Sequence, residues 1–331
     1  MICLGIESTA HTLGVGIVDG TRVLANSKRM YKPPASQGIL PRAAADFHGD
    51  NFLPALSEAL ATSGVKLRDV GLFSFSRGPG IGQCLRVSCT GAKYLASKYG
   101  KPVLGVNHCA AHLEISRGLL SMRDPLYVYV SGANTQLIIG NQASGRKGLA
   151  QGAPRYSVLG ETLDMGLGNL FDVFAREAGF AFSHGSEVAR LAQSGSYFPL
   201  PYTVKGMNFA FAGLLTSSVR AVGTHRTEDI CHSLMETAFA ELCEAAERAL
   251  CLTGKKEMTV CGGVAQNARF CRMLSMVCKE HGARFGVVAP EYNADNGAMI
   301  AYLGALEWQR GKRAKISELK PDGYWRIDEV F

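Results

Sequence analysis

The sequence predicts an α/β protein with two lobes, each built around its own hydrophobic core. The chain has 331 residues, which exceeds the size at which one core normally stops growing. Its hydrophobic content of 47% is sufficient for two cores. A unit of strand, small polar turn and strand also occurs twice, near residue 2 and near residue 126. We therefore expect an N-terminal lobe at 1–124 and a C-terminal lobe at 125–331.

The first half of the chain opens with one of these units. Apolar runs at 2–6 and 13–18 flank the small polar turn formed by Glu7, Ser8 and Thr9. The elements expected after it are a helix at 41–63, a strand at 70–76, a glycine-rich turn at 77–82 and a helix at 83–99.

The second half repeats the unit and adds another glycine turn. Apolar runs at 126–130 and 136–139 flank a small polar turn at 131–134. A later strand at 257–261 leads into paired glycines at 262–263 and then a helix. Turns of small residues expose backbone N–H groups to a phosphate or an acyl oxygen, and paired glycines permit close approach of a ligand. Three such turns favour a nucleotide site between duplicated lobes.

A long amphipathic helix is expected from about residue 228 to residue 252. Thr227 is the expected N-cap, and Gly254 is the expected stop.

A histidine pair indicates a metal site. His108 and His112 lie four residues apart, in a segment where Asn107 is a favourable helix N-cap. Residues four apart share one helix face, so both imidazoles can point at one ion. Together with the carboxylate of Asp295 they form a ligand set that suits Fe(II) or Zn(II) better than Mg(II).

Composition narrows the class of protein. The ten cysteines include no C-x-x-C pair, which favours reduced, mostly buried thiols. No apolar run approaches about 20 residues and the start is not basic, so we expect no membrane span, no signal peptide and a cytoplasmic location. The net charge of +7 has the sign expected for a phosphate-rich partner. Five further histidines are expected to be structural or at the surface: His11, His48, His225, His232 and His281.

Seven segments, in order and over nearly the whole chain, resemble one protein family. They are GIESTA at 5–10, GVNHCAAH at 105–112, YVSGANTQ at 129–136, GETLD at 160–164, KGM at 205–207, GGVAQN at 262–267 and DNGAMIA at 295–301. The chain resembles the Gcp/TsaD family of tRNA threonylcarbamoyladenosine synthases, first named O-sialoglycoprotein endopeptidases. The resemblance is closest to the archaeal and eukaryotic branch, whose members work in the KEOPS complex.

The resemblance implies a fold like the actin, Hsp70 and sugar-kinase (ASKHA) group, with a nucleotide cleft between two mixed-sheet lobes. It implies transfer of a threonylcarbamoyl group from threonylcarbamoyl-adenylate to the exocyclic amine of adenosine 37 of tRNA, with release of AMP. One Fe(II) or Zn(II) ion would be held by His108, His112 and Asp295, which act through the metal, with Tyr129 as a further ligand. The positions implied for substrate and nucleotide binding are Tyr129, Val130, Ser131, Gly132, Ala133, Asp172, Gly185 and Asn267.

The resemblance also implies partners. These are tRNA, an atypical kinase/ATPase subunit, a small dimerisation subunit, and a separate synthase that supplies the adenylate. No membrane partner is expected.

The sequence departs from the family pattern on the nucleotide side. Ala133 replaces a glycine, so the turn would be strained if that position required a positive φ. Ala189 stands where the family has a nucleotide-binding glutamate, and Glu187 is close but out of register. Three neighbours of Gly185 also differ from the family pattern: Ser183, His184 and Ser186. These changes put nucleotide affinity in question more than the reaction class.

Three alternative functions are considered. The main one is a catalytically reduced, nucleotide-binding scaffold subunit of the same complex. An endopeptidase would need a general base beside the metal, but Cys109 follows the first histidine where zinc proteases place Glu. A sugar-kinase-like phosphotransferase shares the fold, but the His-His-Asp set is not what a Mg-ATP kinase needs.

Overall fold

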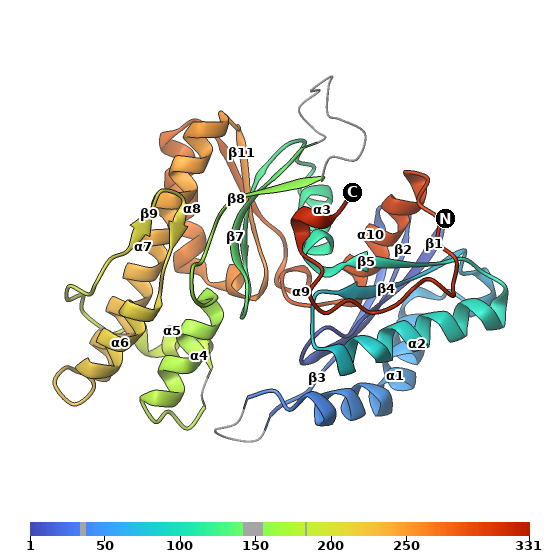
Figure 1. Ribbon diagram of the computed structural model, residues 1–331, viewed down its shortest axis with the longest axis horizontal. Coiled ribbons are helices and arrows are strands. Elements are labelled where there is room, and N and C mark those ends of the chain that lie inside the picture. The colour runs from blue at the N-terminus through green and yellow to red at the C-terminus, as the bar shows by residue number, and fades with distance from the viewer. Residues whose placement is uncertain (34–37, 142–154, 183) are drawn as a thin grey trace. The chain divides into compact units, whose positions relative to one another are not determined.

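The computed structural model describes residues 1–33, 38–141, 155–182 and 184–331, so Ser183 lies outside the described residues. It shows two five-stranded sheets, each in its own compact unit (Figure 1). Unit 1 comprises residues 1–119 and 289–330, and unit 2 comprises residues 120–288 with Phe331.

Unit 1 contains a mixed sheet with the strand order β3-β2-β1-β4-β5. Its strands are β1 (Ile2–Glu7), β2 (Thr12–Asp19), β3 (Arg22–Met30), β4 (Leu72–Gly78) and β5 (Val103–Asn107). Its helices are α1 (Pro41–Ser63), η1 (Leu67–Asp69), α2 (Gly82–Tyr99), α3 (His108–Leu119), α9 (Pro290–Asn293), α10 (Gly297–Gln309) and η3 (Ile327–Glu329). The helix expected at 41–63 is confirmed to the residue. Strand β3 was not predicted because its alternating polar side chains dilute the apolar signal.

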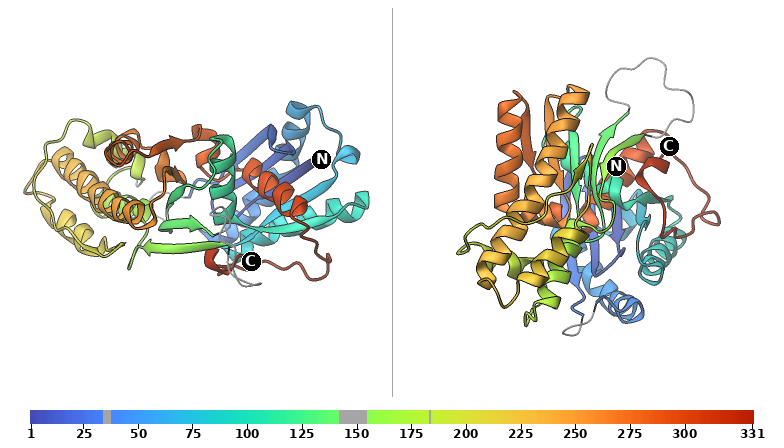
Figure 2. Two further views of the ribbon diagram at one scale, coloured as in Figure 1. Left: turned by 90° about the horizontal axis from the view of Figure 1, so that it is seen from above. Right: turned by 60° about the vertical axis from the view of Figure 1, so that its left-hand side comes forward.

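Unit 2 contains a second mixed sheet with the order β12-β11-β6-β7-β8. Its strands are β6 (Leu126–Val130), β7 (Thr135–Gly140), β8 (Tyr156–Glu161), β11 (Glu257–Cys261) and β12 (Arg284–Val287), with a separate pair formed by β9 (Val204–Lys205) and β10 (Asn208–Phe209). Its helices are α4 (Leu167–Glu177), α5 (Gly185–Ala192), α6 (Ala212–Ala221), α7 (Thr227–Thr253), η2 (Gly263–Gln266) and α8 (Ala268–Glu280). Helices α7 and α8 pack side by side, and both contact the second sheet (Figure 2).

The two sheets have the same internal pattern. In each, the first strand of the repeated unit pairs antiparallel with the second, which pairs antiparallel with a third strand. On its other side the first strand pairs parallel with β4 and then β5 in unit 1, and with β11 and then β12 in unit 2. The repeat read from the sequence therefore corresponds to a repeated sheet topology.

The C-terminal segment packs with unit 1 rather than with the rest of the expected lobe at 125–331. Helix α10 lies against β1 and β2, where glycines on both sides let the backbones meet. A Cβ on Gly16 would lie 2.1 Å from the Ala298 backbone nitrogen, and one on Gly5 would lie 2.1 Å from that of Ala301. A Cβ on Gly297 would in turn lie 2.2 Å from the Gly16 nitrogen. This contact brings the chain around Asp295 into unit 1.

One helix boundary differs from its prediction. Helix α7 begins at Thr227, and its N-cap position is Arg226, which makes no side-chain capping bond. The expectation that Thr227 caps the helix is therefore wrong, because Thr227 already lies in the first turn. The expected stop at Gly254 is confirmed, since that residue has φ 63° and closes the helix with a bond to the Leu250 carbonyl.

Two further expectations concern composition. All ten cysteines are unbridged, and eight of them are buried, as the sequence predicted. Among the described residues, none of the helices combines the length and apolarity needed to cross a membrane.

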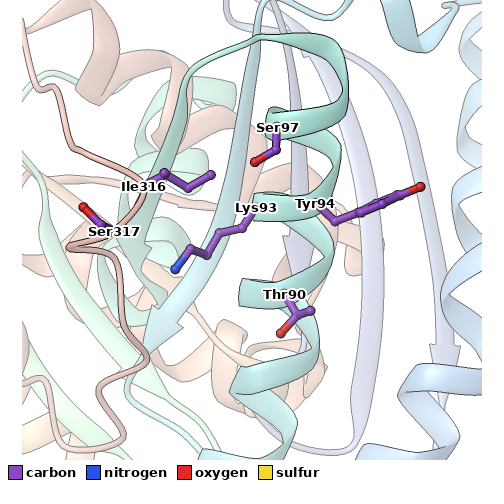
Figure 3. A pocket seen from close by; sticks show the side chains of 6 residues that line it. All are labelled: Thr90, Lys93, Tyr94, Ser97, Ile316 and Ser317. Carbon is purple, nitrogen blue, oxygen red and sulfur yellow. The ribbon is translucent and has the colours of Figure 1, made fainter.

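An open hollow lies on unit 1 where the C-terminal segment passes α2 (Figure 3). The Lys93 ammonium donates to the Leu319 carbonyl at 3.0 Å and so ties this segment to the helix. The residues lining the hollow are Thr90, Lys93, Tyr94, Ser97, Ile316 and Ser317, and none of them is a predicted site residue.

Candidate metal and nucleotide sites

The junction of β5 and α3 presents two buried histidines. Strand β5 ends at Asn107 and the helix begins at His108, with Asn107 Oδ1 accepting a hydrogen bond from the Ala110 N–H at 3.0 Å. The predicted N-cap is thus confirmed. His108 and His112 occupy one face of α3, with ring centroids 4.8 Å apart and planes at 84°. Both rings are thereby held at the end of the sheet.

The third predicted ligand comes from the turn before α10. Asn296 caps this helix, because its Oδ1 accepts the Met299 N–H at 2.9 Å, and its amide donates to the Ala294 carbonyl at 2.8 Å. These bonds hold Asp295 so that its Oδ1 lies 3.3 Å from His112 Nε2 and 3.5 Å from His108 Nε2. All three side chains belong to unit 1.

The spacing of these atoms fits a small divalent metal ion. The ligand atoms of His108, His112 and Asp295 all lie within 4.8 Å of one another. Around a tetrahedral zinc ion with bonds of about 2.0–2.1 Å, neighbouring ligand atoms are separated by about 3.3 Å. The two measured nitrogen–oxygen distances match that separation, and two imidazoles with one carboxylate are a suitable donor set. The residues present therefore fit a first-row metal.

Glu7, at the end of β1, completes the surroundings of the pair. Its Oε2 lies 3.0 Å from Nδ1 of His108, while its Oε1 accepts the Thr9 N–H at 2.6 Å. The carboxylate is fully buried. Because a carboxylate only accepts hydrogen bonds, Nδ1 of His108 donates to Glu7, and Nε2 is the ring nitrogen that faces Asp295. The sequence had not marked Glu7 as a site residue. The one feature of the sequence that could have indicated Glu7 is the position of an acidic residue at the end of an apolar strand.

The charges in this cluster shift one another strongly. Burial disfavours the charged form of His108, but the charge of Glu7, its hydrogen bond and the charge of Asp295 outweigh that cost and raise the pKa of His108 to about 9. Burial lowers the pKa of His112 despite its hydrogen bond with Asp295. Burial would raise the pKa of Asp295, yet the His112 hydrogen bond and the His108 charge hold it well below its usual range. The cluster therefore keeps the Asp295 carboxylate anionic beside the imidazoles of His108 and His112.

The glycine-rich turn at 77–82 supports the Glu7 turn rather than forming a site of its own. The Ile81 N–H donates to the Thr9 carbonyl at 2.8 Å. A Cβ on Gly80 would lie 2.7 Å from that same oxygen, so only glycine fits there. Ser8 adds a bond from its hydroxyl to the Cys84 carbonyl at 2.7 Å. These contacts hold the backbone next to Glu7 in place.

In unit 2, two predicted turns meet at one edge of the sheet. Strands β6 and β11 run parallel, and Tyr129 pairs with Cys261 near their carboxyl ends. The turn at 131–134 and the Gly262 turn therefore begin side by side, as ligand-binding loops do in α/β sheets. A Cβ on Gly262 would lie 2.2 Å from the Val130 carbonyl, so this crossing requires glycine. The sequence-predicted positions 129–133 and Asn267 are thus brought to the same edge.

The turn at 131–134 is well ordered by its own bonds. Ser131 N–H donates to the Asn134 carbonyl at 2.7 Å, and the Asn134 N–H donates to the Ser131 hydroxyl at 3.0 Å. The carbonyl of Gly132 accepts the Asn169 N–H of α4 at 3.0 Å. Ala133 is not strained, because among the described non-glycine residues the positive φ is found at Ser121. The alanine is therefore compatible with this turn.

Asp172 and Gly185 form a second predicted pair. Asp172 Oδ1 accepts the Gly185 N–H at 2.7 Å and so links α4 to the start of α5. Two residues after Gly185, the carboxylate of Glu187 pairs with Arg190, with nitrogen–oxygen distances of 2.6 and 3.0 Å. Ala189 packs against the hydrophobic core of unit 2. The altered residues thus leave the Asp172–Gly185 link intact.

Asn267 acts as a helix cap. Its Oδ1 accepts the Phe270 N–H at 3.1 Å at the start of α8, which leaves its amide NH₂ as the group available to a ligand.

Comparison with known proteins identifies the family. Residues 22–302 match the sequence profile of tRNA N6-adenosine threonylcarbamoyltransferase (TsaD). The chain belongs to this family. A protein of that name from Thermofilum pendens is 46% identical over 331 residues, which span 99% of this chain and 95% of the relative. This chain is therefore an enzyme of the transferase class, as the sequence predicted.

Two further likenesses are to a longer relative and to a solved structure. A probable bifunctional tRNA threonylcarbamoyladenosine biosynthesis protein from Methanococcus maripaludis is 45% identical over all of this chain, which covers 59% of that protein. The crystal structure of T. kodakarensis HypF matches 93% of this chain and 48% of its own, with a TM-score of 0.62 at 13% identity. At that identity the likeness shows the fold alone, and with the two mixed sheets it confirms the expected two-lobed class.

In this member of the threonylcarbamoyltransferase family, one of the four predicted metal ligands, Tyr129, does not belong to unit 1. Tyr129 lies on β6 of unit 2, where its side chain is buried, whereas His108, His112 and Asp295 all belong to unit 1. A role for Tyr129 at the metal stays a prediction.

Proposed function

We propose that this chain transfers a threonylcarbamoyl group from threonylcarbamoyl-adenylate to the exocyclic amine of adenosine 37 in tRNA and releases AMP. The observation that carries the proposal is the convergence of His108, His112 and Asp295 within 4.8 Å in a member of this family. A mixed carbamoyl-phosphate anhydride already has a good leaving group. The protein must therefore mainly orient the reactants and stabilise charge on the carbamoyl oxygen.

We propose that His108, His112 and Asp295 hold one Fe(II) or Zn(II) ion, with Tyr129 as a further ligand. Such an ion supplies a Lewis acid for the developing negative charge, and no redox step is needed. The chain's own contribution is orientation, because Glu7 accepts a hydrogen bond from Nδ1 of His108 and so turns Nε2 toward Asp295, and Asn296 holds the Asp295 turn. His108, His112 and Asp295 therefore act in catalysis through the metal.

We propose that the nucleotide part of the substrate binds along the edge of unit 2 where β6 and β11 end. The central residues of the turn at 131–134, Gly132 and Ala133, offer their backbone N–H groups to the phosphate, as small-residue turns do in other phosphate sites. We also propose that Asn267, Asp172 and Gly185 contact the nucleoside. The absence of a carboxylate at Ala189 removes a charge-assisted hydrogen bond that is worth about 1.5–3 kcal/mol, so ribose recognition is weakened.

The proposed partners follow from charge and from the relatives. A net charge of +7 suits tRNA, whose phosphates attract basic proteins. The bifunctional relative carries a sequence like this chain inside a longer protein, which supports the idea of a multi-part assembly. We propose an atypical kinase/ATPase subunit and a small dimerisation subunit as partners, with a separate synthase supplying the adenylate.

The test is reconstitution with a readout on tRNA. The chain is loaded with iron or zinc, combined with partner subunits, adenylate and tRNA, and the digested nucleosides are analysed by mass spectrometry. We expect threonylcarbamoyladenosine with the native chain and none with Asp295→Ala. His225→Ala serves as a matched control, because His225 is an exposed histidine that stacks on Phe198 in unit 2. If a standard family member forms the product in the same mixture and this chain does not, the scaffold alternative is correct.

A further inference from the structure

A cysteine, a histidine and a glutamate form a connected chain of side chains at one end of unit 2. Cys251 and Glu247 lie four residues apart in the last turns of α7, so they share one helix face. His281, the C-cap residue of α8, lies beside them. Its Nδ1 is 3.6 Å from Cys251 Sγ, and its Nε2 is 2.6 Å from Glu247 Oε1. The imidazole therefore stands between the thiol and the carboxylate.

This order fixes the direction of proton movement. A carboxylate can only accept a hydrogen bond, so Nε2 of His281 carries the proton that Glu247 accepts. The lone pair of the neutral ring then lies on Nδ1, facing the thiol of Cys251. A thiol that donates to an imidazole held by a carboxylate is the arrangement that activates cysteine nucleophiles.

Accessibility separates Cys251 from the other cysteines. Eight of the ten are buried, Cys271 is half-buried, and Cys251 is exposed. Burial raises the pKa of Cys243 to about 12 and that of Cys278 to about 11, so these thiols stay protonated and unreactive. Cys251 alone among them combines access to solvent with a base at hydrogen-bond distance.

The end of α7 has an opposing effect, because its carbonyl groups disfavour a thiolate at Cys251. The attraction between that thiolate and an imidazolium at His281, which Glu247 holds in place, acts in the opposite direction.

We propose that Cys251 is a covalent modification site for low-molecular-weight disulfides. The thiol proton moves to Nδ1 of His281, and the Cys251 thiolate attacks one sulfur of the disulfide. A new bond joins Cys251 to that sulfur, the original sulfur–sulfur bond breaks, and the leaving thiolate takes the proton from His281. The exchange needs no other oxidant and does not depend on the proposed transfer reaction.

The experiment follows the reaction of the full chain with 2-hydroxyethyl disulfide by peptide mass spectrometry over time. We expect the adduct to appear on Cys251 before any other cysteine. His281→Ala should slow that reaction at least about tenfold, and Glu247→Gln should slow it by a smaller factor, because the ring loses its orienting partner. His232→Ala is the matched control, since His232 also lies on a helix of unit 2 but bonds the Ala192 carbonyl, and it should leave the rate unchanged.

Unfolding of a variant is detected in the same spectra. If His281→Ala disrupted the fold, the buried Cys243 and Cys278 would also be modified, and the Glu247→Gln series would then decide. First modification at Cys271, or an unchanged Cys251 rate in both folded variants, would overturn the proposal.

Discussion

At the residue scale, Glu7 decides which nitrogen of His108 faces the other two ligands. It holds Nδ1 at 3.0 Å and is itself anchored by the Thr9 N–H at 2.6 Å, so the orientation of the ring is fixed. Partners of this kind raise the affinity of a histidine for its metal. A buried acid beside the ligands therefore contributes to the site without being a ligand.

Replacing Glu7 tests this role without an activity assay. Glu7→Ala should weaken Zn(II) binding about 10- to 100-fold, because His108 loses its orienting acceptor. The measurement is competition with a chromophoric chelator, supported by the absorption spectrum of the Co(II)-loaded chain. Glu58→Gln, which changes a half-exposed carboxylate paired with Arg29 in the same unit, should bind metal like the native chain. Equal affinity for native and Glu7→Ala protein would remove Glu7 from the site.

Glu241 of α7 predicts a pH dependence of stability. It is fully buried, and burial raises its pKa from 4.5 to about 7 even though its Oε1 accepts the Thr203 N–H at 2.8 Å. The folded state then binds the proton more tightly than the unfolded state. Its contribution to stability is complete below about pH 4.5 and is lost as the pH rises through about 7.

Glu241→Gln should prevent this loss of stability at high pH, because glutamine has no carboxylate to ionise. Its amide oxygen still accepts the Thr203 N–H. We expect the free energy of unfolding to rise by about 2 kcal/mol at pH 8 and to change little at pH 5. Urea unfolding at both pH values measures it. If Glu241→Gln lowered the free energy of unfolding equally at pH 5 and pH 8, the ionised carboxylate would not be the group that destabilises the fold at high pH.

At the scale of elements, the packing of α10 on the first sheet places the third ligand. The contact is made backbone to backbone through Gly16, and it determines where the turn carrying Asp295 begins. Interiors this dense do not accommodate an added methyl group without displacement. The metal site thus depends on a glycine far from it in sequence.

Two glycine-to-alanine substitutions distinguish a clash in this contact from the general effect of alanine on backbone entropy. Gly16→Ala should destabilise the chain by about 3 kcal/mol or more, since its Cβ would lie 2.1 Å from the Ala298 nitrogen. Gly49→Ala, in α1 with open space around its Cβ, should stabilise it by about 0.5–1 kcal/mol. Thermal unfolding measures both. A neutral Gly16→Ala would mean that α10 is not packed as described.

The same elements show what could be predicted from the sequence. Local patterns predicted the helix at 41–63, the paired strand units and the capped histidine helix, because each depends on neighbouring residues. The return of residues 289–330 to unit 1 could not be predicted locally, since it depends on glycines matched across nearly 300 positions. The link between Glu7 and His108 was missed for the same reason. The polar strand β3 lacked the apolar signal on which strand prediction relies.

At the scale of the whole molecule, the net charge of +7 predicts how tRNA binding responds to salt. Association of a basic protein with a polyphosphate releases counterions, so the affinity should fall at least about tenfold between 50 and 200 mM salt. The transfer step takes place on substrates already bound. Its rate under saturating tRNA and adenylate should therefore change far less over the same range.

Filter binding gives the first quantity, and single-turnover formation of the modified nucleoside by the reconstituted complex gives the second. Asp295→Ala provides the matched control, because it should keep the salt-dependent affinity for tRNA while losing transfer. A tRNA affinity independent of salt would contradict recognition through phosphate charge. A transfer rate that falls in parallel with affinity, at saturating tRNA, would instead place screened charges in the chemical step itself.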